Sequence, residues 1–261
     1  MWATPDGSVW IFGGNGTQRA ALDDLWRLSP RPGDPATYDW TWIAGGPGSG
    51  SSARPLARQG AAGWSDDQGN LWLFGGDPES HAEFCNDVWK FDPGATTWTQ
   101  IGPGDCGSGL DLNGLLPSGR YAGTPFITPD GNFWIFGGYG KFLTQTGAVI
   151  LSALSDVWRR SAADGSWMRS TGTQLVSAPA KGLPGVAAPD ATPGGTSYAC
   201  GWADGVGGLW NFGGGQSPWA GRRTDYGDSA PMREEVPAGS YLPSAPKTPI
   251  LAREPWEFRI P

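Results

Sequence analysis

The sequence predicts an all-β chain that is built from tandem copies of one four-stranded unit. Its composition and an internal repeat support this prediction. The 261 residues include 43 Gly, 24 Pro and 16 Trp, and only 16 % of them are charged. Such a composition suits many short strands that tight turns connect. Disorder is the alternative for a chain rich in Gly and Pro, but disordered chains lack aromatic residues, and 12 % of this chain is aromatic.

The repeat is clearest in a short apolar segment that ends in two glycines. Four copies of this segment begin at Gly7, Gly69, Gly131 and Gly207, which are 62, 62 and 76 residues apart. Each copy has the length of a strand that is buried on both faces and is too short for a helix. We therefore expect the second strand of each repeat near residues 8–13, 70–75, 132–137 and 208–213.

The other strands of each repeat are placed around this segment. A first strand precedes it, in residues 58–64, 120–126 and 196–202, and only Met1 and Trp2 supply it in the first repeat. A third strand carries an acidic residue two positions before Trp, as in Asp87 and Trp89. A fourth strand carries Trp40, Trp98 or Trp167, and the sequence ends at Pro261 before a fourth copy of this strand.

The strand that ends in Gly-Gly, the aromatic third strand and the Trp-bearing fourth strand together resemble the Kelch motif. The resemblance implies a Kelch-type β-propeller of four four-stranded blades, with the first and last blades incomplete. We expect a single propeller section over residues 1–261, with approximate blades at 1–43, 56–101, 118–170 and 194–261, and we expect it to be a fragment of a longer propeller. The repeat is longer than the roughly 50 residues usual for Kelch, which long loops explain.

The repeated residues are expected to build the scaffold. A buried Trp removes about 150–250 Å² from water, so we expect nearly every Trp to lie in the core, where neighbouring blades pack on each other. The predicted structural residues are Trp10, Gly13, Gly14, Trp26, Trp72, Gly75, Gly76, Trp89, Trp134, Gly137, Gly138, Trp158, Trp210, Gly213, Gly214 and Trp256.

Two further features of the scaffold leave alternatives open. Arg58 and Arg120 stand at the same position, at the head of the first strand, where each could hold a ligand carboxylate or form an ion pair with Asp87 or Asp156 of the third strand. We favour the ion pair. Cys85 and Cys106 could form a disulfide in an oxidising compartment, or both could remain buried thiols.

Charge and composition restrict the classes of partner. The formal net charge of −7 disfavours nucleic acid and anionic membrane surfaces. The sequence has no apolar run long enough to span a membrane, and its start lacks the features of a signal peptide. One histidine and three cysteines without CxxC spacing predict no metal site and no cofactor. The oligomeric state is unknown, and the compartment is unknown with an extracellular location slightly favoured.

The lengths of the connections predict which face binds a partner. In a meander of four strands the loops alternate between the two ends of the blade. Turns between the first and second strands and between the third and fourth are short, whereas the other connections are long, and recognition is usually built on long loops of a rigid scaffold. We expect this long-loop face to recognise a protein segment or a glycan. The candidate binding residues are Glu79, His81, Tyr139, Lys141, Phe142, Trp219, Arg222 and Arg223.

Catalysis is the alternative to binding. Among Kelch-like enzymes, a copper oxidase of the galactose oxidase type would need two histidines, and this sequence has only His81. An epimerase of Kelch architecture would need an acid and a base at the mouth of the ring, and no such pair can be assigned. No catalytic residue is therefore predicted, and the alternative function is a part of a carbohydrate-active Kelch-type enzyme whose catalytic residues lie outside this sequence.

Overall fold

The structure is a computed structural model of the chain. It describes residues 1–17, 20–46, 54–78, 83–107, 109–110, 114–143, 147–171, 193–215 and 256–258. The described elements are β-strands, and every pair of neighbouring strands is antiparallel. The predicted all-β fold is confirmed.

Each repeat forms its own sheet, in which the strands follow one another in chain order. The first sheet contains β1 (Trp2–Ala3), β2 (Val9–Asn15), β3 (Ala21–Arg31) and β4 (Asp34–Ala44). The second contains β5 (Ala62–Ser65), β6 (Leu71–Gly76), β7 (Cys85–Asp92) and β8 (Thr97–Ile101). The third contains β10 (Thr124–Ile127), β11 (Phe133–Phe136), β14 (Val157–Arg160) and β15 (Trp167–Thr171), and the fourth contains β16 (Ser197–Ala203), β17 (Leu209–Gly215) and β18 (Trp256–Phe258).

The third repeat departs from the expected pattern in two ways. Its first strand is divided into β9 (Arg120–Tyr121) and β10, which lie on either side of Ala122, a residue with a φ of 54°. The connection after β11 was expected to be a loop, but it contains the hairpin of β12 (Tyr139–Leu143) and β13 (Val149–Ala153). Since β12 also pairs with β9, these three strands make a separate small sheet at the long-loop face.

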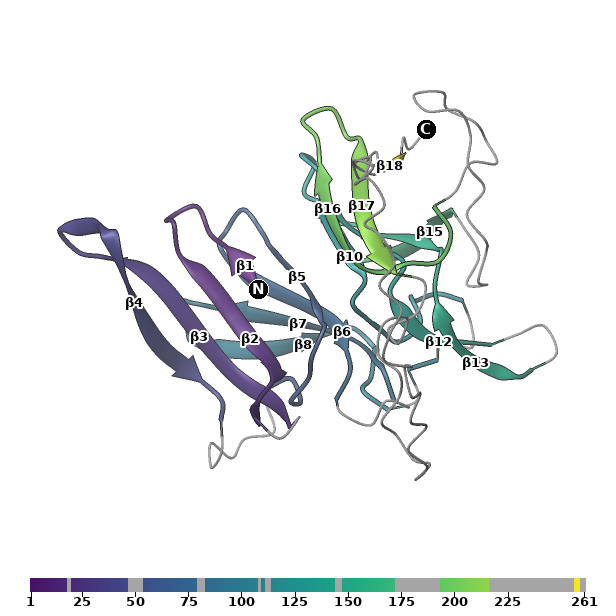
Figure 1. Cartoon of the computed structure of the whole chain (residues 1–261), viewed down its shortest axis with the longest axis horizontal. Helices are drawn as coiled ribbons and strands as arrows, with labels where there is room; N and C mark the ends of the chain where they lie inside the picture. Colours follow the sequence, from purple (N-terminus) through teal and green to yellow (C-terminus); the bar gives the residue numbers. More distant parts are fainter. Residues whose placement is uncertain are drawn as a thin grey trace, which may run out of the picture.

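The sheets pack face to face in chain order, and their first strands lie next to one another. Figure 1 shows the sheet of β1–β4 in purple beside β5–β8 in blue, with β16 and β17 in green at the opposite end. Apolar side chains fill the space between neighbouring sheets, as the Kelch resemblance implies. The core between the first and second sheets is formed by Trp2, Trp10, Phe12, Leu25, Leu71, Leu73, Trp89, Phe91 and Trp98. The core between the second and third sheets is formed by Ala62, Trp64, Phe74, Val88, Phe133, Ile135 and Trp158.

In the first three repeats, the first glycine of the Gly-Gly pair lies close to the backbone of the next repeat. A Cβ on Gly75 would lie 2.7 Å from the carbonyl oxygen of Arg120, and a Cβ on Gly137 would lie 2.5 Å from that of Thr196. Both glycines also have a positive φ, 68° and 61°. The second glycine donates a hydrogen bond across the same junction, as from Gly138 N to Thr196 O at 2.7 Å. The double glycine therefore joins this strand to the next repeat.

Replacing Gly137 by Ala is expected to destabilise the protein by about 2 kcal/mol or more, because the new Cβ meets backbone atoms and the residue keeps a strained φ. Gly33→Ala is the matched control, since Gly33 also has a positive φ of 84° but a Cβ there would meet nothing within 4 Å. Urea denaturation of both variants measures the difference. Equal losses of stability would show that the close contact between repeats contributes nothing beyond backbone strain.

The prediction that nearly every Trp lies in the core is wrong at three positions. Trp40 and Trp42 on β4 are 53 % and 54 % exposed, and Trp202 on β16 is 46 % exposed. These residues belong to the first and last sheets of the described structure. Among the described residues, each of these sheets has a neighbouring sheet on only one side, so its other face is left open to solvent. The Trp residues between sheets are buried or partly buried: Trp158 is 1 % exposed, whereas Trp72 and Trp167 are partly buried.

Candidate functional site

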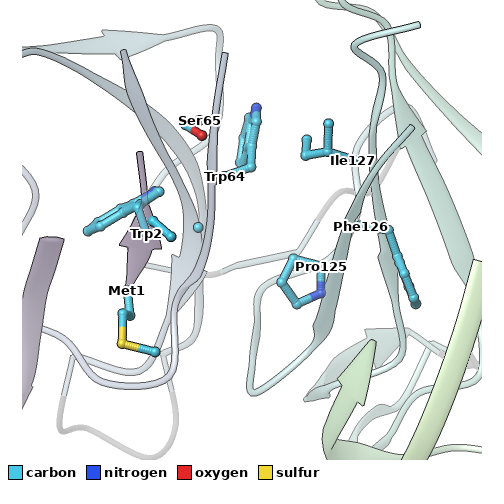
Figure 2. Close-up of a pocket in the computed structure, with 9 residues that line it drawn as sticks. Met1, Trp2, Trp64, Ser65, Pro125, Phe126 and Ile127 are labelled. Atoms are coloured by element: carbon cyan, nitrogen blue, oxygen red, sulfur yellow. The ribbon is translucent and has the colours of Figure 1, made fainter. Parts of the chain in front are cut away.

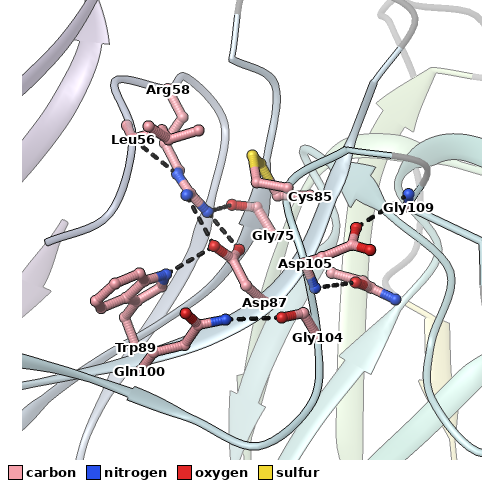
Figure 3. Close-up of polar contacts among 12 residues, drawn as sticks. Leu56, Arg58, Gly75, Cys85, Asp87, Trp89, Gln100, Gly104, Asp105 and Gly109 are labelled. Atoms are coloured by element: carbon pink, nitrogen blue, oxygen red, sulfur yellow. Dashed lines mark hydrogen bonds and ion pairs between the residues drawn. A yellow bond between two sulfur atoms is a disulfide. The ribbon is translucent and has the colours of Figure 1, made fainter. Parts of the chain in front are cut away.

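The arginine at the head of the first strand belongs to the scaffold. Arg58 donates from Nη1 and Nη2 to the two carboxylate oxygens of Asp87, at 2.6 and 2.9 Å, and its Nη1 also donates to the carbonyl of Gly75 at 2.9 Å (Figure 3). The same carboxylate accepts a hydrogen bond from the indole N–H of Trp89 at 2.7 Å. Both charged side chains are almost completely buried, at 0 % and 4 % exposure.

The third repeat has the same arrangement. Arg120 donates to both oxygens of Asp156 at 2.6 and 2.9 Å and to the carbonyl of Gly137 at 3.0 Å, and Trp158 donates to Asp156 at 2.6 Å. The predicted ion pairs are therefore confirmed, and the alternative of a ligand-binding arginine is wrong. The guanidinium donors of Arg58 and Arg120 are used inside the fold, where the fork geometry fixes the first strand against the third.

The carboxylates of the short-turn face are also used within the fold. Asp66 accepts hydrogen bonds from the Asn70 backbone at 2.9 Å and from the Trp72 indole at 2.8 Å. Burial would raise the pKa of Asp66, but these hydrogen bonds outweigh burial and lower it. Asp204 holds Trp210 in the same way at 3.0 Å. This face is therefore a set of satisfied hairpin turns rather than an array of free acids.

An apolar cavity of about 210 Å³ lies at the short-turn ends of three neighbouring first strands. Figure 2 shows Trp2 and Trp64 on one side of the cavity and Pro125, Phe126 and Ile127 on the other. Ligand pockets usually have volumes of roughly 300–1,000 Å³ and a few converging polar groups. The cavity is smaller than that, and none of the side chains that line it is charged. It is a weaker candidate than the opposite face.

At the long-loop face, three tyrosines from two repeats gather at the inner ends of the strands. We call Tyr121, Tyr139 and Tyr198 the aromatic rim. The ring of Tyr121 makes edge-to-face contacts with Tyr139 and Tyr198, at centroid distances of 5.9 and 5.8 Å. Phe84 supports the rim from below, with its ring 5.2 Å from Tyr121 and 1 % exposed. Tyr121 is buried, Tyr139 is half-buried and Tyr198 is 60 % exposed, so the rim rises from the core to the surface.

Hydrogen-bonding side chains extend the rim toward the first repeat. Asn15 donates from Nδ2 to Gln59 Oε1 at 2.7 Å, and Gln59 donates from Nε2 to Asp77 Oδ2 at 3.1 Å. The backbones of Gln59 and Asp77 also exchange two hydrogen bonds of 2.9 Å. The long-loop face therefore carries the amides of Asn15 and Gln59 beside the phenol rings, and the Asp77 carboxylate is buried beneath them.

Tyr198 is held in a backbone conformation that is unusual for its residue type. Its φ is 58°, and the equivalent residues of the preceding repeats, Ala122 and Gly60, have φ values of 54° and 62°. Hydrogen bonds link the three positions, from Ala122 N to Gly60 O at 2.7 Å and from Tyr198 N to Ala122 O at 2.9 Å. A bulky residue with positive φ is uncommon, and such strain gathers at functional sites. The strain here places an exposed phenol at the inner edge of the long-loop face.

The electrostatics of the rim keep Tyr121 neutral. Burial raises its pKa above the usual range, and the hydrogen bond to Tyr198 and the charge of Asp77 act in the same direction. Burial also raises the pKa of Tyr139. The rim therefore offers neutral phenol groups, which can donate and accept hydrogen bonds and can pack against apolar groups.

A disulfide between Cys85 and Cys106 fixes the support of the rim. It joins the start of β7 to the connection that follows β8, next to Phe84 (Figure 3). The carbonyl oxygen of Phe84 packs so closely on Gly109 and Gly119 that neither position has room for a Cβ. Of the two alternatives left open by the sequence, the structure has the disulfide.

The structure places only some of the predicted binding residues. Tyr139 is a member of the rim, and Lys141 lies two residues further along β12, half-buried. Phe142 is in the same strand, but its side chain lies outside the described part of the structure. Glu79, His81, Trp219, Arg222 and Arg223 also lie outside the described residues. The long-loop face as a binding surface remains a prediction.

The sequence analysis missed Gln59, Asp77, Tyr121 and Tyr198. A signal for the first three existed in the repeat itself. Gln59 and Tyr121 follow the repeated arginine, and Asp77 and Tyr139 follow the double glycine, so each is a variable residue directly after a recurring one. Tyr198 had no such signal, because Thr196 stands at the arginine position in the fourth repeat. Variable residues at fixed places on a repeated scaffold are where repeat proteins present their binding side chains.

Within the described residues, no group of three or more His, Cys, Asp and Glu side chains could hold a metal ion. The same part of the chain contains no helix that is long and apolar enough to cross a membrane.

The chain is similar to a family model and to a solved structure. The family model described as the KLHDC2/KLHL20/DRC7 Kelch-repeats domain matches residues 1–183. The solved structure of YjhT is 16 % identical in sequence, with a TM-score of 0.48, over 80 % of this chain and 56 % of that chain. The chain thus spans little more than half the length of that solved structure. Because the family model matches well over half of the sequence, the chain belongs to the family of Kelch-repeat domains.

Proposed function

We propose that this Kelch-repeat module binds a segment of a partner protein across the aromatic rim of its long-loop face. The proposal depends most on the exposure of Tyr198. Its side chain is 60 % exposed, although its backbone has a positive φ of 58°. Tyr supplies a large and rigid contact area with a polar end, and it is enriched at protein interfaces. The rest of the predicted site, including Lys141 and Phe142 and the residues outside the described structure, belongs to the same proposal.

A protein segment is favoured over a glycan by the groups that surround the rim. Asn15 and Gln59 place two side-chain amides beside three phenols, and the buried Asp77 carboxylate accepts a hydrogen bond from the Gln59 amide. These groups can pair with the amide N–H and C=O groups of an extended peptide while the rings contact its side chains. Arg58 and Arg120 cannot take part, because their donors are paired inside the fold.

Selection of a random peptide library on the immobilised protein tests the proposal, followed by measurement of affinity for the peptides that bind. Tyr198→Ala and Tyr139→Ala are each expected to weaken binding by about tenfold or more, since anchor residues contribute at least about 1–2 kcal/mol. Tyr38→Ala is the matched control, because Tyr38 is 46 % exposed on the first sheet, away from the rim. This variant should bind like the wild type.

Stability measurements separate a lost contact from a damaged scaffold. Because Tyr198 is exposed, Tyr198→Ala should change the free energy of unfolding by only about 0.5 kcal/mol. Peptides whose affinity is unchanged in both rim variants, but falls when Trp64 or Ile127 of the short-turn cavity is replaced, would refute the proposal. Binding to a glycan array in place of any peptide would refute the choice of ligand class.

A further inference from the structure

Arg160 occupies a position that is apolar in the preceding repeats. It is the last residue of β14. In the strand register, Val9 lies opposite Leu28, Leu71 lies opposite Phe91, and Phe133 lies opposite Arg160. The third repeat therefore has a guanidinium where the first two have a Leu and a Phe. An apolar side chain fills this position in the first two repeats, so packing alone does not explain the arginine in the third.

The side chain of Arg160 is largely buried, its guanidinium reaches solvent through the cavity that it lines, and it contacts no anionic partner among the described residues. The residue is 9 % exposed. Its Cζ lies 4.7 Å from the centre of the Trp72 ring, a cation–π contact with the neighbouring sheet. No salt bridge or side-chain hydrogen bond of this guanidinium is found among the described residues, in contrast to the ion-paired Arg58 and Arg120. Burial lowers the pKa of Arg160, and the charge of Asp164 opposes this effect without forming an ion pair.

The side chain lines a cavity of about 210 Å³ between the second and third sheets. This cavity is separate from the aromatic rim and from the apolar cavity of the short-turn face. Its wall combines apolar side chains with two further polar residues, Asn86 and Ser166. Gly165 borders it as well, and a Cβ there would lie 2.8 Å from Arg160 Nη2, so the glycine leaves room for the guanidinium.

We propose that this cavity binds a carboxylate group, with Arg160 as the residue that recognises it. A buried cation without a partner is costly, and a carboxylate can satisfy its planar fork of N–H donors with two hydrogen bonds. A singly charged, planar group fits better than a phosphate, because Asp164 lies near enough to repel a second negative charge. The carboxylate belongs to a small organic acid or to an acidic side chain of a peptide, which share this chemistry.

The sequence alone does not indicate this site. A third strand that ends in Arg159 and Arg160 resembles an ordinary solvated strand end. Only the register shows that one of the two arginines points into the core between sheets, while Arg159 lies 5.8 Å from the Trp134 ring of its own sheet.

Titration with sodium acetate and with sodium glutarate, followed by NMR of the arginine Nε–H and tryptophan indole signals, tests the proposal. Saturable shifts of the Arg160 and Trp167 signals are expected with both acids, and inorganic phosphate at the same ionic strength should bind at least about tenfold more weakly. A short peptide rich in Glu is the second arm: binding of the peptide tenfold or more tighter than glutarate assigns the carboxylate to a protein side chain, and equal or weaker binding assigns it to a small acid.

Three variants make the test decisive. Arg160→Leu copies the first repeat and is expected to fold and to lose the shifts, and Arg160→Lys should weaken acetate binding at least about tenfold because it keeps the charge without the fork. Arg169→Leu is the matched control, because this exposed arginine lies on the adjacent β15. The proposal is overturned if no acid gives saturable shifts, if the shifts persist in Arg160→Leu, or if Arg169→Leu abolishes them equally.

Discussion

Replacing Arg120 by Met is expected to lower the free energy of unfolding by about 3–5 kcal/mol, because it leaves the carboxylate of Asp156 buried without its cation. Asp156 is fully buried, and in this variant the Trp158 indole is the remaining side-chain hydrogen-bond donor to its carboxylate among the described residues. The carbonyl of Gly137 loses its donor in the same variant. Equilibrium denaturation in urea or guanidinium chloride measures the loss.

Arg27→Met is the matched control for this experiment. Arg27 forms an ion pair with Asp6 at 2.7 Å, but the two side chains are 36 % and 52 % exposed. Solvent screens such a pair, so its loss should cost about 1 kcal/mol at most. If Arg120→Met costs no more than Arg27→Met, the buried pair does not hold the first strand against the third, and the structural role assigned to the repeated arginine is wrong.

Replacing Trp158 by Ala is expected to destabilise the protein by about 3–5 kcal/mol, since the change removes a large ring from the core between the second and third sheets. Trp158 is 1 % exposed, and its loss also takes a donor from Asp156. Trp40→Ala removes the same side chain from an open face, where Trp40 is 53 % exposed. The control should therefore retain most of its stability.

The difference between the two tryptophan variants tests how the sheets stack. Comparable losses in Trp158→Ala and Trp40→Ala would mean that Trp40 is also buried, and that the first sheet has a covering partner. A small loss in both variants would contradict the face-to-face packing of the second and third sheets.

The repeat made most of the scaffold predictable. The second strands were found because an apolar run, a turn glycine and a double glycine coincide at each copy, and β2, β6, β11 and β17 follow that pattern. The pairing of Arg58 with Asp87 was also predictable, because two charged residues recurred at fixed places on strands that must lie close together. The division of the sequence into approximate blades stays a prediction.

Exposure of the tryptophans and the details of the site were not predictable in the same way. A Trp in a fourth strand has the same local sequence whether or not another sheet covers it, as Trp40 and Trp98 show. The hairpin of β12 and β13, and its pairing with β9, were missed because the described parts of the other repeats have no such hairpin in this connection. The aromatic rim depends on this pairing, which brings Tyr139 beside Tyr121.

In the proposed function, the inner part of the long-loop face is the binding surface, while the turns and ion pairs form the scaffold. Hydrogen–deuterium exchange of the protein with and without a selected peptide tests it most directly. We expect slower exchange in residues 59–61, 121–123 and 197–199, at the heads of the first strands, and unchanged exchange in the short turns at 66–69, 128–131 and 204–207. Slower exchange that is confined to those turns and to the cavity beside Trp64 and Ile127 would contradict the claim.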